Sequence, residues 1–309
     1  MPDAKLTTSN KRSLVTPISK WRGIGLRVLA TFLLASMSAC VHAAAKQAAL
    51  GQIVFYRSLF ALLPILIYAF WVTPNFASLK TKHPMQHLTR GVFGAVTMVL
   101  AFLSLAYLPV ASATALAYLV PIISLPLAAH LLHERIAKPL FFAVIIGFVG
   151  VLLIVAPAFD TPDLNRSILT GTAAGIGYAI FMAILRVYIK RMTDTETPVS
   201  IAFYFALICT VLSVFAAPQT WPSVDSATLV ALIGAGILGG LGHIAATEAV
   251  ARAPLSVLAP FEYLGLIWAI GFDIFLFAQF PTLVTLMGCV LITAAAVFVL
   301  FNKRISDAS

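Results

Sequence analysis

Residues 254–268 of the chain read P-L-S-V-L-A-P-F-E-Y-L-G-L-I-W, and residues 109–123 read P-V-A-S-A-T-A-L-A-Y-L-V-P-I-I. Both stretches begin with a proline, and Tyr118 and Tyr263 occupy the same position in each. Each proline follows an almost connectorless return from the preceding apolar run. That places it near the first turn of a helix, where proline is well tolerated. Such self-similarity predicts that the chain is built from two related halves.

The composition is that of an integral membrane protein. Hydrophobic residues make up 61% of the 309 residues, charged residues only 10%, and the mean hydropathy is +1.00. Soluble domains have about 25% charged residues. Apolar runs of roughly 20 residues, each long enough to cross about 30 Å of hydrocarbon as a helix, recur along the chain. We expect ten spans, at 24–43, 52–72, 88–108, 111–132, 138–157, 168–189, 198–216, 228–251, 254–277 and 281–302.

The offset of 145 residues between the two stretches maps the fourth run onto the ninth, and therefore five runs onto five. Because five is odd, the two halves are inverted in the membrane, a recurring plan of alternating-access carriers. The predicted fold is an all-α integral membrane protein with ten transmembrane helices in two inverted five-helix repeats. The expected divisions are an N-terminal tail at 1–23, a first repeat at 24–157, an extracytoplasmic linker at 158–167, a second repeat at 168–302 and a C-terminal tail at 303–309.

The basic charge of the chain is distributed as a topology signal. Of the 20 Lys and Arg residues, 17 lie in or beside the two tails and alternate connectors, while the other side has only Lys46 and Arg166. Lys and Arg accumulate on the cytoplasmic side of membrane proteins. We therefore expect a multi-pass protein of the cytoplasmic (inner) membrane with both termini in the cytoplasm. The net charge of +9 does not indicate a nucleic-acid partner.

The N-terminal region has a second interpretation. A basic segment, an apolar stretch and Ala43-Ala44-Ala45 resemble a secretory signal with its cleavage site. Cleavage there would leave nine spans and place the N-terminus outside the cell. We expect the run to remain as the first helix, because it is long for a signal core and the repeat requires it.

Several long stretches resemble the drug/metabolite transporter superfamily, EamA type, over residues 24 to 302. The resemblance implies a carrier of small metabolites with a central cavity lined by helices one to four and six to nine. Helices five and ten would be peripheral. One departure is the Glu134-Arg135 pair, whose counterparts in the second half are Gln279 and Phe280. The stretches that carry the resemblance are FYRSLFALLPILIY at 55–68, AYLPVASATALAYLVPI at 106–122, HERI at 133–136 and GGLGHIAATEAVARAPLSVLAPFEYLGLIWA at 239–269.

The sequence contains little that points to an enzyme, metal or cofactor. Cys40, Cys209 and Cys289 fall within apolar runs and have no metal-ligand spacing. Neither a phosphate-binding G-x-x-x-x-G-K-[ST] loop nor an H-E-x-x-H motif occurs. We expect no metal and no cofactor, and an intramembrane enzyme is a distant alternative. The inverted repeat argues against a channel, whose pore usually comes from oligomeric symmetry.

Glu262 is the most informative polar residue, because an ionisable group inside the membrane usually faces a cavity or a partner. It lies eight residues past Pro254, about 12 Å into its helix. His243 lies at a similar depth in the preceding helix, and we expect the two to approach each other directly or through water. Glu262 would bind substrate or carry a coupling proton.

Helical spacing places polar and small residues on one face of three expected helices. Such faces indicate either a shared cavity or close helix contacts, and for the Gly and Ser positions we favour helix contacts. The three faces are Thr31, Ala35, Ser38 and His42; Gly236, Gly240, His243 and Thr247; and Glu262, Leu266, Ala269 and Asp273.

Two further charges have more than one interpretation. Arg57 and Asp273 lie a few residues from the outer ends of their spans. They would form an ion pair that closes an outer gate, or Arg57 would simply extend to the membrane surface. Glu248 and Arg252, at i and i+4, predict a local salt bridge.

Aromatic side chains suggest the cargo. Tyr118, Tyr263 and Trp268 lie on the repeat-related helices, and tyrosine offers a stacking face and a hydroxyl. With Glu262 and His243 they form the predicted substrate site. A flat heteroaromatic compound taken up by the cell, such as riboflavin, is the first candidate. The alternatives within the family are an amino-acid or metabolite exporter and an S-adenosylmethionine carrier. The expected partners are the small-molecule substrate and the lipid bilayer, and a homodimer is compatible with the sequence.

Overall fold

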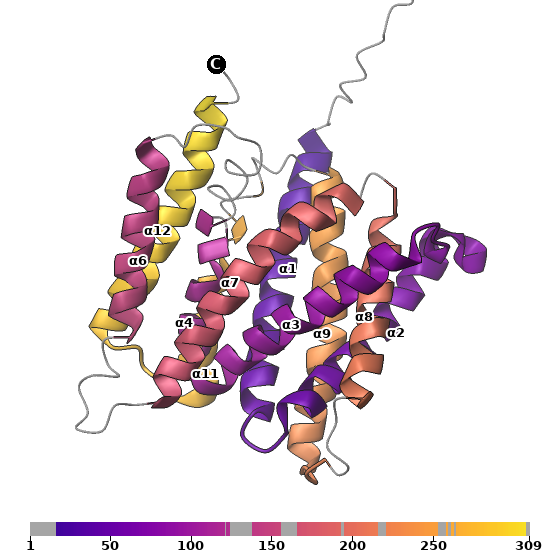
Figure 1. Ribbon diagram of the computed structural model, residues 1–309, viewed down its shortest axis with the longest axis horizontal. Helices are drawn as coiled ribbons and strands as arrows, with labels where there is room; N and C mark the ends of the chain where they lie inside the picture. The colour runs from indigo at the N-terminus through magenta and orange to yellow at the C-terminus, as the bar shows by residue number, and fades with distance from the viewer. Residues whose placement is uncertain are drawn as a thin grey trace, which may run out of the picture.

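The computed structural model describes residues 17–120, 122–123, 138–155, 166–192, 195–215, 221–252, 258, 261–262 and 264–306. Within this part the chain forms ten α-helices and one short 3-10 helix, η1 (Figure 1). The elements are α1 (Pro17–Ala44), α2 (Leu50–Val72), η1 (Pro74–Leu79), α3 (Pro84–Tyr107), α4 (Val110–Ala117), α6 (Lys138–Val155), α7 (Arg166–Met192), α8 (Pro198–Phe215), α9 (Ser226–Arg252), α11 (Leu264–Phe277) and α12 (Leu283–Ser306).

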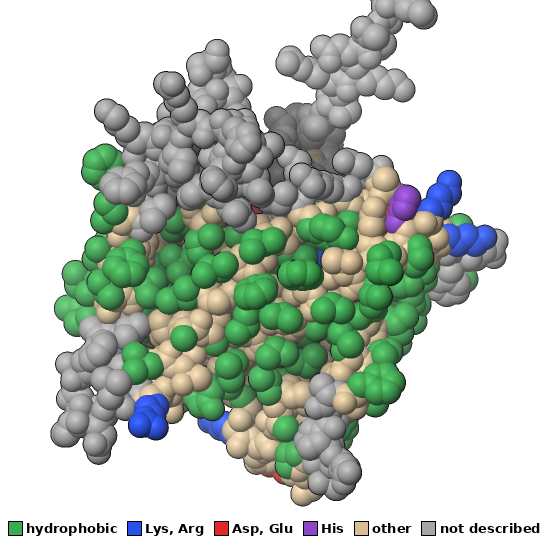
Figure 2. All heavy atoms as spheres, viewed as in Figure 1, with side chains coloured by type: hydrophobic (Ala, Val, Ile, Leu, Met, Phe, Trp, Pro, Cys, Tyr) green, Lys and Arg blue, Asp and Glu red, His purple; other side chains and the backbone are tan. Residues whose placement is uncertain are grey.

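The helices correspond to the ten predicted apolar runs. Six of those described are long and apolar enough to cross a membrane, in α1, α2, α3, α7, α8 and α9, and α6, α11 and α12 contain shorter apolar segments. Trp71, Phe215 and Phe275 are among many large apolar side chains left exposed, as expected where lipid replaces water. Figure 2 shows hydrophobic side chains over the middle of one face, with most of the visible Lys and Arg at its margins.

The helix contacts have two-fold symmetry. The packing of α1 on α9 is repeated by α7 on α3, that of α2 on α9 by α8 on α3, and that of α1 on α11 by α7 on α4. The symmetry-related pairs α2 with α8, α4 with α11 and α6 with α12 also pack against each other. Figure 1 shows α1 beginning on the face where α12 ends, and α7 beginning on the opposite face. The described helices therefore form the two predicted inverted repeats.

Close packing of α2 on α9 depends on glycine. A Cβ atom on Gly240 would lie 2.5 Å from Pro64 Cγ and 3.0 Å from the carbonyl oxygen of Ala61. Gly236, one turn earlier, faces the backbone of α2 at Phe60. These two glycines therefore serve helix contact, as predicted for them, because only a residue without a side chain lets the helices approach this closely.

A buried carboxylate joins two connectors on one face of the bundle. Glu196, between α7 and α8, is only 6% exposed. Thr81 Oγ1 donates to its Oε1 at 2.7 Å, and the backbone N–H of Lys82 donates to the same oxygen at 3.3 Å. His87 Nε2 lies 3.2 Å from its Oε2. The segment before α3 is thus fixed to the segment before α8.

This environment perturbs the ionisation of Glu196. Burial acts to raise the pKa of the carboxyl, but the hydrogen bond from Thr81, the nearby His87 ring with its charge and the Lys82 N–H together hold the pKa below its usual value. A depressed pKa in the folded state stabilises the protein above the unfolded-state pKa. That stability is lost as the pH falls through the folded-state pKa.

Substitution Gly240→Ala should lower the thermal stability of the detergent-purified protein. The added methyl group must push α2 away from α9, and overpacking of this kind costs about 1–3 kcal/mol. Gly271→Ala in α11 is the matched control, because a Cβ there meets nothing within 4 Å, and its melting temperature should be unchanged or slightly raised. Equal melting temperatures for the two variants would contradict the close contact at Gly240.

Substitution Glu196→Gln should lower the melting temperature at pH 7, because hydrogen bonds to a charged group contribute about 1.5–3 kcal/mol. The difference from the wild type should begin to shrink as the pH falls below about 4.3, the usual glutamate pKa, and should vanish below the lower folded-state pKa, where the wild-type carboxylate also becomes protonated in the folded protein. Unfolding measured between pH 7 and acid tests this. Parallel pH profiles for the two proteins would show that Glu196 does not carry the predicted pH dependence.

Candidate functional site

A cavity of about 380 Å³ lies between the two halves. Its lining comes from α1, α2, α3 and α4 of the first half and from α7, α8, α9 and the region of Glu262 and α11 in the second. The described residues of α6 and α12 contribute nothing to it. These are the helices that the family resemblance assigns to the cavity and to the periphery. The volume lies within the roughly 300–1,000 Å³ usual for small-molecule sites.

The predicted polar face of α1 lines this cavity for most of its length. Thr31, Ala35 and Ser38 all contribute to the wall, as their spacing on one helical face predicts. His42, the last residue of this face, does not line the cavity and instead contacts α3. Its Nδ1 lies 2.6 Å from the carbonyl oxygen of Leu105 in α3, and the ring is buried.

Glu262 lines the cavity and forms an ion pair with Arg27 of α1. The hydroxyl of Tyr118 donates to the backbone oxygen of Glu262 at 3.1 Å. The structure thus brings two predicted site residues together, one from each half. Arg27 was not predicted as a site residue, because an arginine near the start of a span looks like a topology charge. The available signal was its position three residues inside the expected first span.

His243 lines the cavity from α9 and pairs with Arg57 of α2, with Arg57 Nη2 3.0 Å from His243 Nε2. Arginine has donors only, so Nε2 must accept this hydrogen bond. His243 is therefore neutral in this arrangement, with its proton on Nδ1. The predicted direct approach of His243 to Glu262 does not occur, because each of the two residues has an arginine partner instead.

Arg90 is a cavity residue that the sequence analysis missed. It lies within the third expected span, in the second turn of α3, and is only 9% exposed. Its guanidinium carbon stands 4.1 Å from the centre of the Phe205 ring, a cation–π distance. It also lies against Gly94, where any Cβ atom would collide with the guanidinium. One feature of the sequence points to this position: Gly94 follows Arg90 by four residues, so the two share a helix face on which the glycine leaves room for the arginine side chain.

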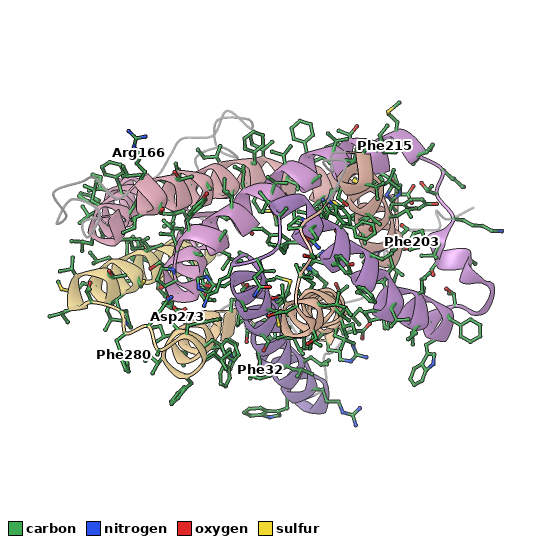
Figure 3. The ribbon with its side chains drawn as sticks, turned by 90° about the horizontal axis from the view of Figure 1, so that it is seen from below. Phe32, Arg166, Phe203, Phe215, Asp273 and Phe280 are labelled. Carbon is green, nitrogen blue, oxygen red and sulfur yellow. The ribbon has the colours of Figure 1, made fainter. Side chains whose placement is uncertain are left out.

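Asp273 is nearly completely buried, at 1% exposure, and binds the N-terminus of α4. The backbone N–H groups of Val110 and Ala111 donate to its two carboxylate oxygens at 2.8 and 2.7 Å. A carboxylate is favoured there because the N-terminal N–H groups of a helix have no other partners. Figure 3 shows Asp273 directed into the bundle, whereas Arg166 points away from it.

The predicted outer ion pair is therefore not formed in this structure. Asp273 contacts the backbone of α4, and Arg57 contacts His243. Both contacts join the first half to the second. Sequence patterns could not identify the partner of Asp273, because a backbone N–H group occurs at almost every residue.

The remaining predicted residues have different outcomes. Tyr263 lies outside the described residues. Trp268 packs edge-on against Phe32 of α1, with ring centres 5.3 Å apart, and is not among the cavity-lining residues. The predicted Glu248–Arg252 salt bridge is present, and Tyr68 also donates to Glu248. Within the described part of the chain, no group of three His, Cys, Asp or Glu side chains could hold a metal ion.

Comparison with known proteins gives two matches to one family. The sequence profile of the EamA-like transporter family matches residues 21–156 and, separately, residues 169–301. A crystal structure covering 91% of this chain and 95% of its own chain superposes with a TM-score of 0.62 at 18% identity. At this identity the structural similarity concerns the fold alone.

Two curated relatives are similar over most of their length. The S-adenosylmethionine uptake transporter of Rickettsia felis is 28% identical over 253 residues, which are 82% of this chain and 83% of that protein. The pseudopaline exporter of Pseudomonas aeruginosa strain UCBPP-PA14 is 29% identical over 286 residues, which are 91% of this chain and 97% of that protein.

Substitution Asp273→Ala should destabilise the protein, because two buried N–H groups lose their acceptor, and each such loss costs about 1–3 kcal/mol. Asp273→Asn keeps one acceptor oxygen and should have an intermediate effect. The measurement is thermal unfolding in detergent. Asp225→Ala, which removes an acceptor at the exposed start of α9, serves as the comparison and should have a smaller effect. If Asp273→Ala melts with the wild type, Asp273 does not stabilise the α4 contact.

Proposed function

Because this chain belongs to the EamA-like transporter family, whose profile matches both of its halves, we propose that it is a secondary carrier working by alternating access. It moves a small organic metabolite across the cytoplasmic membrane. The observation that carries this proposal is the cavity of about 380 Å³ enclosed by eight helices, four from each repeat. In carriers built from inverted repeats, the substrate site lies near the membrane midplane between the repeats.

Two contacts between the halves lie on opposite sides of the cavity and suit the two gates of such a carrier. The Arg27–Glu262 pair lies toward the face where α1 begins. The Asp273 contact with the start of α4 lies 11 residues further along the second-half chain, in the last two turns of α11. Alternating access would break one of these contacts while the other holds.

S-adenosylmethionine is the first candidate cargo. The Rickettsia relative is named for its uptake, and S-adenosylmethionine combines a flat adenine ring with a charged amino-acid group. The cavity has surfaces for both, with Tyr118, Tyr178 and Phe205 as aromatic groups and Arg57 and Glu262 as charged groups. The relatives described above give no support to riboflavin, the first candidate from the sequence.

Export is the second candidate function. The pseudopaline exporter matches a larger share of this chain, 91%, than the uptake transporter does. The geometry of a central site is compatible with both directions, because a secondary carrier follows the summed gradients of its ligands. The transport direction is therefore part of the test.

The proposed orientation places both termini in the cytoplasm. The start of α1 and the end of α12 lie on the same face (Figure 1). With Arg27 and Arg90 set aside because they line the cavity, 15 of the 20 Lys and Arg residues lie in or beside the tails and the connectors expected on that side. The positive-inside rule assigns that side to the cytoplasm.

Purified protein reconstituted into liposomes should accumulate radiolabelled S-adenosylmethionine in a saturable manner, above protein-free liposomes. Ser38→Trp, which fills the cavity, should reduce the initial rate at least tenfold. Ser36→Trp should transport normally, because Ser36 lies on the same helix outside the cavity lining. Outward movement from preloaded vesicles tests export in the same preparation. The cargo assignment is wrong if S-adenosylmethionine neither crosses nor competes with another carried compound.

A further inference from the structure

We propose that Arg57 and Arg90 together form a carboxylate-binding subsite of the central cavity, so that the cargo is a carboxylate-bearing metabolite held by that group. This inference rests on the proposed carrier function, and it specifies both the chemical class of the cargo and its orientation in the cavity. It is carried by the contacts and burial of the two arginines and by the charge balance around them.

Arg57 supplies one cation of the subsite. It is 4% exposed and lines the cavity from α2. Its Nη2 atom is directed to His243 Nε2 and lies 3.8 Å from the sulfur of Met37, while its Nε has no hydrogen-bond partner among the described residues. Neither His243, which is neutral here, nor a thioether sulfur compensates a full positive charge.

Arg90 supplies the second cation, from the neighbouring helix α3. It is 9% exposed, and its Nε and Nη1 atoms have no hydrogen-bond partner among the described residues. The ring of Phe205 holds the guanidinium by one face. Stacking leaves the edge of the guanidinium, where its N–H groups are, available to an acceptor.

The charge balance of the cavity calls for an anion. Glu262 is the one acidic residue in the described lining, and it is already paired with Arg27. Among the described residues, neither Arg57 nor Arg90 has a carboxylate partner. Both arginines line the same cavity, from helices α2 and α3, which pack against each other. Buried charges without a partner are strongly unfavourable, and a residue pair of this kind inside a membrane protein usually faces a ligand.

A carboxylate matches this arrangement in charge and shape. Guanidinium groups bind carboxylates through two parallel N–H···O bonds, and such bonds are roughly twice as strong as neutral ones. A carboxylate between α2 and α3 would direct the rest of the cargo toward the Tyr118 and Glu262 side of the cavity. In S-adenosylmethionine the amino-acid carboxylate would then lie at the arginines.

The test measures thermal unfolding of the full-length protein in detergent with pairs of compounds that differ only in the carboxylate. S-adenosylmethionine is compared with decarboxylated S-adenosylmethionine, and succinate with succinamide. Each ligand is titrated in sodium gluconate buffer, and dissociation constants follow from the concentration dependence of the shift. Sodium chloride titrated alone tests whether an inorganic anion occupies the same place.

For at least one pair, the carboxylate should bind the wild type about ten- to hundredfold more tightly than its partner compound, the contribution expected of a charge-assisted hydrogen bond. Arg57→Gln and Arg90→Gln should each lose most of this difference. Arg90→Lys keeps the positive charge but not the paired N–H donors of the guanidinium, and it should retain part of the preference for the carboxylate. Arg166→Gln is the matched control, because Arg166 points away from the bundle (Figure 3), and it should behave like the wild type.

Equal binding of both members of every pair, or no shift with any carboxylate, would overturn the proposal. A shift with chloride alone that both Gln variants lose would also overturn it, because the site would then hold an inorganic anion. A succinate shift that depends on both arginines, together with no transport of S-adenosylmethionine, would keep the subsite and reject the cargo assignment. Failure of the subsite and failure of the proposed function are thus distinguishable.

Discussion

An ionised side chain inside a lipid bilayer is tolerated only when another group compensates its charge, and this constraint shapes the centre of the protein. Arg27 is compensated by Glu262 across the boundary between α1 and the second half. Asp273 is compensated by the N–H groups at the start of α4. Each of these contacts joins one repeat to the other. The groups that compensate the buried charges therefore also fix the two halves to each other around the cavity.

The helix contacts are symmetric, whereas the chemistry of the cavity is not. The contact of α1 with α9 has its counterpart in that of α7 with α3, and the contact of α2 with α9 has its counterpart in that of α8 with α3. The charged groups do not follow this symmetry. The three arginines of the cavity lie in the first half, and His243 and Glu262 lie in the second. A two-fold scaffold therefore supports alternation between two faces, while an asymmetric site holds a ligand in one orientation.

Much of this arrangement was predictable from the sequence, because it depends on patterns along one helix. The matching stretches at 109–123 and 254–268 predict the inverted repeats, and the period of α1 predicts that Thr31, Ala35 and Ser38 share a face. The partners across helices were not predictable. A periodic pattern shows which face of a helix a residue occupies but not which residue of another helix lies opposite. The sequence therefore suggested His243 as the partner of Glu262, whereas the partner in the structure is Arg27.

Arg90 illustrates the limit most clearly. Near the end of a span, an arginine that marks topology and an arginine that enters a cavity have the same sequence context. The distinction depends on Gly94 and Phe205, one from the same helix and one from α8. Likewise, the partners of Asp273 are two backbone N–H groups, and these cannot be recognised from residue types because almost every residue has one.

The most direct test of the account is a structure of the full-length protein determined with S-adenosylmethionine bound. The account predicts ligand density in the central cavity, with the carboxylate between the guanidinium groups of Arg57 and Arg90 and the remainder toward Tyr118 and Glu262. Density outside this cavity, or a ligand in the cavity whose carboxylate is remote from both arginines, would contradict it.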